Sequence, residues 1–559
     1  MKKRIVAILL ALAMLLSTVA LAETAAYPVE GEGSLTFVAT EPNTLNMVQA
    51  SSNLDSAVFY LTSAMLYRPY NGNVYPELAA KCDVSEDKLT YTYTLKDAVY
   101  SDGTPIVAAD FAYYMIATMD GTSAAYYKNG TKYMNGECTA ADVGIYAKDE
   151  KTLVVELEML TADFSPELEI YPLQQAFVEA KGEQLGGTPA DLMYSGPYVL
   201  TEWVYGSYMT FKKNPSYVDA AASFPLAELR LIHSVDESGR YSMFTSGEAD
   251  VLTFISEETQ QMIPNQAKQY VSDAMQGLEF NTTGMMFDAA QGTFLPRDAE
   301  VTKVLSNENF RKALSYAINR ELLVMVINPS GLPVNRLVTP MAEGNTDGSR
   351  FVEDYPLTAD YAAPITGDAE AAKAYLAKAL EELGYASVKD LPTIKYLCFE
   401  NGAFRLMAET LQSEWKSILG LECIEIEMKP VQDAVMSMVF LNYDIYFQSV
   451  SSSSATPRSF LEQWKTGGAI SDAMQSGAPF GSVYSNAEFD ALVEQAMFEF
   501  DTAKRQALIA QAEQIMIEEH IFVPILLQGG YYAVQDYVQG FVSVGNQEGY
   551  MFNHTTVTK

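Results

Sequence analysis

The sequence has few of the residues that build metal centres and nucleophilic active sites. Its 559 residues include three histidines, His233, His520 and His554, and four cysteines, none with a partner at metal-ligand spacing. No G-x-S-x-G, H-E-x-x-H, P-loop or G-x-G-x-x-G motif is present. We therefore expect no metal, no cofactor and no catalytic residues. A secreted hydrolase stays as the alternative class, because acidic pairs are too numerous for spacing to identify or exclude a glycosidase.

Positive charge is also scarce. The chain has 36 Lys and Arg against 71 Asp and Glu, so its formal net charge is −35. Such a charge repels phosphate backbones and anionic lipid, so we expect no nucleic-acid partner. The hydrophobic content of 48% and the charged content of 19% are typical of a globular protein.

Long apolar runs are lacking except at the N-terminus. Lys2-Lys3-Arg4 is followed by the apolar run Ile5–Leu16 and by Ala20-Leu21-Ala22, which together predict a signal peptide over residues 1–22. The nearest cysteine beyond it is Cys82, so no lipobox cysteine is available. We expect an exported protein that is extracellular, cell-surface-associated or periplasmic.

The four cysteines leave disulfide pairing open. Export permits disulfides, and four cysteines allow three pairings. Cys82 and Cys138 could pair. Cys398 and Cys423 are expected on neighbouring strands but at unlike heights.

The stretch Leu89–Met119 carries the strongest local pattern. Leu89, Tyr91, Tyr93 and Leu95 alternate with polar residues, which predicts a half-buried strand. Asp102-Gly103 supplies a turn. The apolar spacing from Phe111 to Met119 then predicts a helix.

This stretch and several later motifs resemble one protein family. The motifs are Pro76-Glu77-Leu78-Ala79, Tyr91-Thr92-Tyr93, Ser101–Phe111, Gly196-Pro197-Tyr198, Asn214-Pro215-Ser216-Tyr217, Gly247–Val251 and Phe310–Arg320. In order and spacing they resemble the family 5 extracellular solute-binding proteins of ABC importers, the oligopeptide- and dipeptide-binding proteins. The ordered matches run from about residue 35 to 545.

The resemblance implies an α/β fold with two lobes, the periplasmic-binding-protein-like fold of type II and cluster C, with an extra inserted α+β subdomain. It implies that lobe I consists of residues 23–54, 186–276 and 526–559, that the subdomain is 55–185, and that lobe II is 277–525. From the residues themselves, strands over Thr393–Phe399 and Glu422–Met428 with a helix between them predict a parallel βαβ unit. We expect a monomer.

The expected ligand-binding residues lie in loops that follow strands. Ligands of open α/β sheets bind outside the carboxyl ends of the strands. Three such segments follow Ser34–Thr40, Thr393–Phe399 and Tyr443–Phe447, and a fourth lies where the chain returns from lobe II to lobe I. The candidates in these segments are Glu41, Asn43, Thr44, Glu400, Asn401, Gln448, Ser449, Ser451, Ser453, Ser454 and Tyr531.

One departure from the family bears on the solute. Peptide binders of this family place a Trp after the strand and an Asp three residues later, and this Asp pairs with the α-ammonium of the peptide. Val450 and Ser453 stand at these places here. The resemblance implies delivery of a solute, an oligopeptide first, to the permease subunits of an ABC transporter. A neutral oligosaccharide or another non-peptide solute is the alternative.

Overall fold

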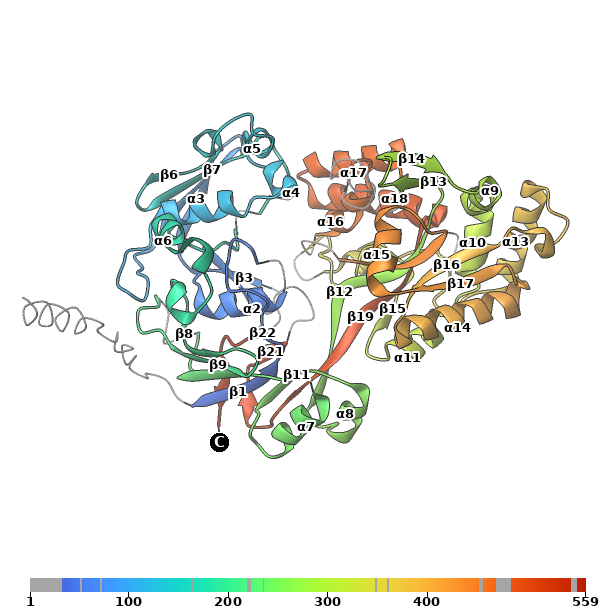
Figure 1. The fold of residues 1–559 in the computed structure, drawn as a ribbon. Helices are drawn as coiled ribbons and strands as arrows, with labels where there is room; N and C mark the ends of the chain where they lie inside the picture. Colours follow the sequence, from blue (N-terminus) through green and yellow to red (C-terminus); the bar gives the residue numbers. More distant parts are fainter. Residues whose placement is uncertain are drawn as a thin grey trace, which may run out of the picture.

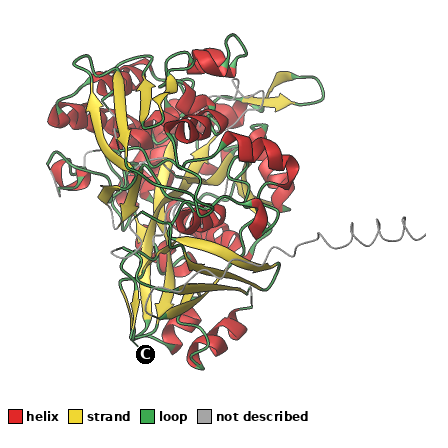
Figure 2. Ribbon diagram, turned by 90° about the vertical axis from the view of Figure 1, so that its left-hand side faces the viewer, coloured by secondary structure: helices red, strands yellow, loops and turns green. Residues whose placement is uncertain are grey.

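The structure is a computed structural model that describes residues 33–50, 53–70, 73–162, 164–165, 167–218, 223–234, 236–346, 349–358, 361–451, 456–468, 484–543 and 550–558. One large mixed sheet connects two lobes (Figure 1). Lobe I contains its β11-β1-β10-β9-β8 end and lobe II its β17-β16-β18 end. The C-terminus lies at the base of lobe I (Figure 2).

The large sheet has the strand order β17-β16-β18-β12-β19-β11-β1-β10-β9-β8, with β15 paired to β19. In that order the strands are β17 (Ile424–Lys429), β16 (Ile394–Phe399), β18 (Ile445–Val450), β12 (Ala267–Phe280), β19 (Phe522–Val534), β11 (Val251–Ile255), β1 (Ser34–Ala39), β10 (Glu228–His233), β9 (Tyr208–Lys213) and β8 (Tyr198–Val204), and β15 is Leu332–Pro333. The long strands β12 and β19 pass from one lobe to the other, and the predicted boundaries at 276/277 and 525/526 fall inside them.

Smaller sheets complete the strands. A four-stranded sheet has the order β4-β5-β7-β6, with β4 (Ala79–Val84), β5 (Thr90–Leu95), β7 (Thr152–Glu156) and β6 (Ile145–Asp149). Two-stranded pairs are β2 (Tyr67–Tyr70) with β3 (Asn73–Pro76), β13 (Met285–Asp288) with β14 (Thr293–Pro296), β20 (Val538–Gln539) with β23 (Thr556–Val557), and β21 (Val542–Ser543) with β22 (Tyr550–Met551).

Helices pack on the sheets in both lobes. In lobe I they are α2 (Asn53–Thr62), α3 (Ala108–Ala117), α4 (Gly121–Ala124), α5 (Gly130–Met134), α6 (Gln175–Lys181), α7 (Glu237–Thr245) and α8 (Glu257–Met262). In lobe II they are α9 (Ala299–Ser306), α10 (Glu308–Tyr316), α11 (Arg320–Ile327), α12 (Phe351–Asp354), α13 (Ala369–Leu383), α14 (Gly402–Leu419), α15 (Val431–Val439), α16 (Pro457–Leu461), α17 (Ala487–Phe498) and α18 (Thr502–Glu519). No helix in the described part of the chain combines the length and apolarity that a membrane crossing requires.

The elements with clear periodicity form as predicted. Tyr91, Tyr93 and Leu95 of β5 are buried and alternate with half-buried threonines. Helices α13 and α14 end at Gly384 and Gly420, whose φ angles of +79° and +72° suit a residue without a Cβ. Strands β16 and β17 on either side of α14 are parallel, as the βαβ pattern predicts.

Two of the family motifs meet in the core of lobe I. The Glu77 carboxylate accepts hydrogen bonds from Arg68 Nε at 2.8 Å and from the Met65 amide at 2.9 Å. The hydroxyl of Tyr217, from the Asn214–Tyr217 motif, donates to Glu77 Oε1 at 2.5 Å. Arg68 and Glu77 are both buried, so this paired charge holds the inserted segment onto the β9 end of the sheet.

The motif Phe310–Arg320 has a similar structural role in lobe II. The buried Arg311 donates to the carbonyl of Leu305, in the last turn of α9, and to that of Glu519, the last residue of α18. The buried Arg320 donates to the carbonyl of Pro524 at 2.7 Å, at the start of β19. Burial lowers the pKa of each arginine to about 10. The motif thus fixes the point from which the chain returns to lobe I.

The structure leaves the four cysteines unpaired, and Cys398 and Cys423 lie at unlike heights, as expected. Cys82 faces Tyr93 across β4 and β5, while Cys138 lies beside the carbonyl of Asn129, so the two are held by different neighbours. Cys398 is level with Met428 of β17, and Cys423 precedes that strand, so the two thiols lie at opposite ends of the pair.

Candidate functional site

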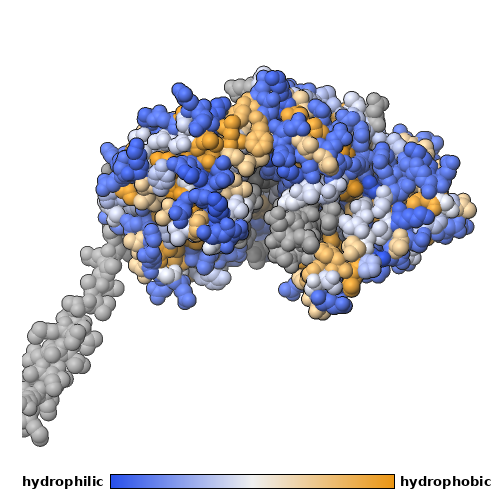
Figure 3. Space-filling model, turned by 90° about the horizontal axis from the view of Figure 1, so that it is seen from above, coloured by the Kyte–Doolittle hydropathy of each residue, from blue (hydrophilic) through white to orange (hydrophobic). Residues whose placement is uncertain are grey.

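In both lobes the carboxyl ends of the parallel strands point toward the crossing, the place where β12 and β19 pass from one lobe to the other. Strand β11 is antiparallel to β19, which enters lobe I, so β11 runs back toward lobe II, and β1 and β10 are parallel to it. Strand β18 is antiparallel to β12, which enters lobe II, so β18 runs toward lobe I, and β16 and β17 are parallel to it. The space-filling view shows the surface hollowed between the lobes (Figure 3). The two edges that bind ligands in such sheets therefore face each other.

Strands β12 and β19 are irregular where they cross between the lobes. Their register shifts between Val271 and Met275, where three residues of β12 lie opposite one of β19. On β19, a Cβ added to Gly529 would lie 1.9 Å from the carbonyl oxygen of Ser330, and one added to Gly530 would lie 2.4 Å from the hydroxyl of Tyr270. Both positions therefore require glycine, because the neighbouring atoms leave no space for a Cβ.

Asp273 lies in this register shift and was not among the predicted site residues. Burial raises the pKa of its carboxyl group, which has no ion-pair partner among the described residues. It is also close along β12 to Met275, which pairs with Val450 at the carboxyl end of β18. A desolvated carboxylate without a partner favours a cation as its neighbour, and perturbed carboxylates of this kind gather at functional sites.

The carboxylate of Glu41, the first predicted site residue, is held within lobe I. It accepts hydrogen bonds from Trp203 Nε1 at 2.6 Å and from the amide of Gly206 at 2.9 Å, so the β8–β9 hairpin occupies both of its oxygens. The amide of Glu41 donates to Nδ1 of His233, at the end of β10, at 2.9 Å. Glu41 thus positions the loop after β1 beside the hairpin.

Asn43 and Thr44 are fixed through their main chain. The buried carboxylate of Asp55 accepts hydrogen bonds from both amides, at 2.7 and 3.1 Å. The Thr44 hydroxyl accepts from the amide of Asn46 at 3.0 Å. The side chain of Asn43 is exposed, which leaves its amide group available to a ligand.

On the lobe II side, Glu400 and Asn401 connect β16 to α14. The Asn401 side chain accepts from the amide of Ala403 at 3.0 Å and so caps α14. The amide of Glu400 donates to the carbonyl of Lys429 at 2.8 Å, which joins this loop to the end of β17. Both side chains are exposed.

The Ser-rich segment begins later than predicted. Gln448 and Ser449 belong to β18 and pair with Gly277 and Gln276 of β12, because the strand continues to Val450. Gln448 Oε1 is buried without a hydrogen-bond partner in the described structure. Ser451 is exposed directly after the strand. Ser453 and Ser454 lie outside the described residues.

Tyr531 packs on the side of β19 that faces α7 and α8. It contacts the apolar cluster that contains Phe244, Leu252 and Ile255. Burial raises the pKa of its hydroxyl group. The neighbouring Tyr532 points to the opposite face, where its ring centroid is 6.5 Å from that of Tyr270. The two adjacent tyrosines therefore serve different faces of the crossing.

The lobes also touch away from the crossing, beside α17. The amide of Ala162 donates to the carbonyl of Met497 at 2.8 Å. Arg458 Nη2 donates to the hydroxyl of Tyr126 at 3.2 Å. Lys88 Nζ lies 4.3 Å from the ring centroid of Phe500. The local sequences around Trp203, Arg458 and Asp273 contain no binding motif. Long-range hydrogen bonds reveal the first two, and burial reveals Asp273.

Comparison with known proteins agrees with this arrangement. The family model "Bacterial extracellular solute-binding proteins, family 5 Middle" matches residues 73–472. The oligopeptide-binding protein OppA of Bacillus subtilis is 26% identical over 532 residues, covering 92% of this chain and 91% of that protein. The probable deoxycholate-binding periplasmic protein YgiS of Escherichia coli is 25% identical over 530 residues, again 92% and 91% of the two chains.

Solved structures show the same fold. The substrate-binding domain of an oligopeptide ABC transporter from Bacillus anthracis superposes with a TM-score of 0.70 at 24% identity, over 95% of this chain and 100% of that one. OppA of Listeria monocytogenes, bound to peptide, superposes with a TM-score of 0.69 at 21% identity, over 95% and 100%. The chain belongs to the family 5 bacterial extracellular solute-binding proteins.

Proposed function

We propose that this protein binds an oligopeptide between its lobes and delivers it to the permease subunits of an ABC importer. The observation that carries the proposal is the convergence of the carboxyl ends of β1, β10 and β11 with those of β16, β17 and β18 at the crossing. A solute held there contacts both lobes at once, and such contacts favour the closed arrangement of the lobes. The names of the oligopeptide-binding relatives support peptide as the solute.

The charge anchor for such a peptide lies elsewhere than in the peptide-binding relatives. Ser453 occupies the expected place of the Asp. Glu41 is engaged by Trp203 and Gly206, so its carboxylate does not reach a ligand without losing both bonds. Asp273 remains as the desolvated carboxylate at the crossing. We assign the α-ammonium group to Asp273, because burial of an ammonium without an anion is costly.

A neutral oligosaccharide or another non-peptide solute is the second candidate. It is favoured by the hydroxyl and amide groups of Asn43, Gln448 and Ser451 and by the absence of an acidic residue at position 453. The relative named as probably deoxycholate-binding supports non-peptide solutes in proteins of similar sequence.

The proposal also covers the export of the protein, its oligomeric state, its partners and its lobe boundaries. Residues 1–22 are a signal peptide cleaved before Glu23, and the mature protein is an exported monomer without nucleic-acid partners, metal, cofactor or turnover. Lobe I comprises 23–54, 186–276 and 526–559, the inserted subdomain 55–185, and lobe II 277–525. Mass spectrometry of the native protein tests the start at Glu23, and retention of residues 1–22 or an N-terminal acyl group contradicts it.

Calorimetry with three ligand sets tests the solute class: free peptides, N-acetylated peptides and neutral oligosaccharides. Submicromolar binding of free peptides together with a smaller radius of gyration in X-ray scattering supports the proposal. Binding of oligosaccharides alone supports the second candidate. An unchanged radius at saturation contradicts closure of the lobes. Ser453→Asp should create peptide binding only if position 453 lies at the ammonium site and the natural solute is not a peptide.

A further inference from the structure

The two lobes meet at a second place, away from the crossing. Figure 1 shows α4 and α5 of lobe I beside α16 and α17 of lobe II, above the crossing strands. The contacts there pair side chains and main-chain groups from the two lobes, and they include Lys88 with Phe500, Tyr126 with Arg458, and Ala162 with Met497. We call these six residues the latch.

On the side of lobe I, the latch residues come from three segments of the inserted subdomain that are bonded to one another. The amide of Leu157 donates to the carbonyl of Leu89, the neighbour of the latch lysine, at 2.8 Å. The amide of Glu158 donates to the carbonyl of Tyr126 at 2.9 Å. The same segment then leads to Ala162. The three latch residues of the subdomain therefore move together.

On the side of lobe II, the latch residues also belong to one packed unit. Helices α16, α17 and α18 share an apolar cluster that contains Phe460, Phe489, Val493 and Ile509. Phe500 lies in the turn between α17 and α18, where Arg505 Nη1 donates to the carbonyl of Glu499 at 3.0 Å. The Phe500 ring is nevertheless 37% exposed. A fixed turn thus presents an aromatic ring to the other lobe.

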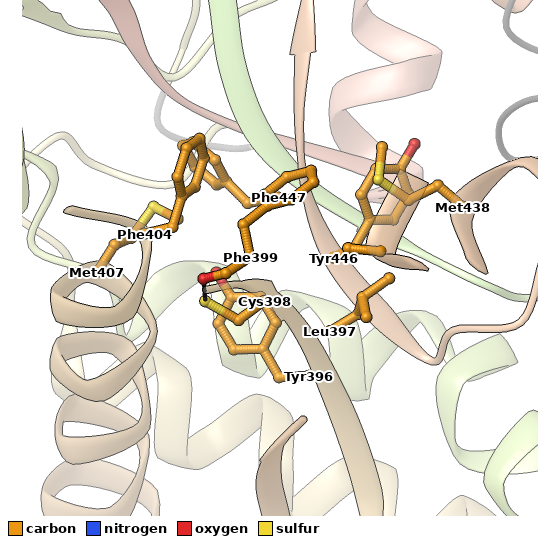
Figure 4. Close-up of a pocket in the computed structure, with 10 residues that line it drawn as sticks. Tyr396, Leu397, Cys398, Phe399, Phe404, Met407, Met438, Tyr446 and Phe447 are labelled. Carbon is orange, nitrogen blue, oxygen red and sulfur yellow. Dashed lines mark hydrogen bonds between the residues drawn. The ribbon is translucent and has the colours of Figure 1, made fainter. Parts of the chain in front are cut away.

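Lobe II is close-packed up to its carboxyl edge. The cavity at the ends of β16 and β18 has room for about one water molecule (Figure 4). Its lining is divided between the two faces of the strands, with Cys398 and Phe447 on the side of α14 and Leu397 and Tyr446 on the side of α15. Because close-packed interiors resist deformation, the lobes open by movement at the crossing, and this movement separates the latch.

The latch contacts are of a kind that breaks readily. The amide of Ala162 donates to the Met497 carbonyl at 2.8 Å, and Lys88 Nζ lies 4.3 Å from the centroid of the Phe500 ring. Lys88 is exposed, so water solvates its ammonium group as soon as the lobes part. Water likewise replaces the partners of the hydrogen bonds. A large apolar interface would instead hold the lobes together permanently.

We propose that the inserted subdomain serves as a latch on lobe II, whose contacts form when the lobes close and break when they open. The latch lowers the fraction of open molecules, with or without solute. Because solute enters and leaves only through the open form, a weaker latch should accelerate both steps. The inference goes beyond the proposed function, since it holds for whichever solute the protein carries.

Hydrogen exchange at the Ala162 amide tests the latch in the full chain without added solute, because this N–H is bonded across the lobes and exchanges when they part. Lys88→Met removes the charge at nearly the same length and should accelerate this exchange about 2- to 5-fold, whereas Lys88→Arg keeps the charge and should leave it unchanged. Tyr126→Phe removes the hydroxyl that accepts from Arg458 and should accelerate it about 2- to 10-fold.

Two substitutions in the same subdomain are matched controls. Lys148→Met alters an exposed lysine of β6, and Tyr133→Phe alters a half-buried tyrosine of α5. The described structure shows no bond from either side chain to lobe II, so neither substitution should change exchange at Ala162. The Leu157 amide, which is bonded within the subdomain, is the internal reference, and its exchange should stay constant in every variant.

The outcomes separate the latch from the proposed function. An unprotected Ala162 amide in the unaltered protein overturns the latch, and so does equal exchange in the latch and control variants. Equal acceleration at Ala162 and Leu157 also overturns it, because the substitutions then loosen the subdomain instead of parting the lobes. If the expected pattern appears but neither peptides nor oligosaccharides bind, the latch stands and the proposed solute is wrong.

Discussion

Replacing Glu41 with Ala should loosen the β8–β9 hairpin rather than abolish solute binding. The substitution removes the acceptor of the Trp203 indole N–H and of the Gly206 amide. Hydrogen bonds to a charged acceptor contribute about 1.5–3 kcal/mol each. Of the donors left behind, Trp203 is half-buried and Gly206 is exposed, so we expect a local loss of about 2–4 kcal/mol. Glu41→Gln keeps one acceptor but directs an NH2 group at the other donor, so its effect should be intermediate.

Hydrogen exchange measures this loss where it occurs. A local destabilisation of about 2–4 kcal/mol accelerates exchange of the Gly206 amide roughly 30- to 1,000-fold. Trp415 and Trp464 lie in core clusters of lobe II, away from the hairpin, so a change in tryptophan fluorescence on substitution reports Trp203. Asn43→Ala is the control, because the Asn43 side chain is exposed and the bond to Asp55 comes from its main-chain N–H, which the substitution keeps. Loss of peptide affinity by more than about a hundredfold with unchanged exchange at Gly206 would refute the structural role of Glu41.

Three further substitutions test the crossing and the core of lobe II. Asp273→Asn should lower the affinity for free peptides about tenfold or more and leave N-acetylated peptides unaffected; equal losses in calorimetry would remove Asp273 as the ammonium partner. Burial raises the pKa of Glu414 to about 7 in the folded protein, so the unfolded chain loses this proton first, and stability should fall by about 1–3 kcal/mol as pH rises from about 4.5 to 7. Denaturation of Glu414→Gln across this range should show a smaller slope, and an identical slope contradicts the assignment. Gly529→Ala places a Cβ against the Ser330 carbonyl and should destabilise the protein by about 1–3 kcal/mol in thermal unfolding, whereas Gly121→Ala meets no atom within 4 Å and serves as the control.

The sequence predicts elements whose signal is local. The buried positions Ala372, Leu376, Ala379 and Leu383 of α13 follow the helical period, and the structure buries all four. Helices α17 and α18 begin directly after Asn486 and Asp501, residues of the N-cap type whose side chains accept hydrogen bonds from the first turn, so their starts are visible in the chain. Strand β18 was misplaced because Gln448 and Ser449 carry polar side chains, whereas pairing with β12 keeps their backbone in the sheet.

The role of a site residue depends on contacts that the sequence does not display. Glu41 lies 162 residues before Trp203, and neither local sequence indicates that the two side chains form a hydrogen bond. The position of the loop after β1 was predictable, because the carboxyl edge of a sheet follows from strand order. Whether a carboxylate there faces a solute or a neighbouring hairpin is decided by packing between distant segments. The same holds for Asp273, whose burial follows from a register shift in β12.

The contacts between the lobes indicate how closure is controlled. The contacts near α17 include a backbone hydrogen bond from Ala162, a hydrogen bond from Arg458 to Tyr126, and the Lys88–Phe500 pair. Interactions of these kinds contribute about 0.5–1.5 kcal/mol each, so together they stabilise contact between the lobes by only a few kcal/mol. A solute that binds both carboxyl edges adds differential free energy of the same size or larger, and about 5.5 kcal/mol moves a two-state equilibrium from 1:99 to 99:1. Weak contacts between the lobes therefore leave the solute as the deciding contribution, which is the property that a delivery protein requires: an empty molecule that opens readily and a loaded one that stays closed.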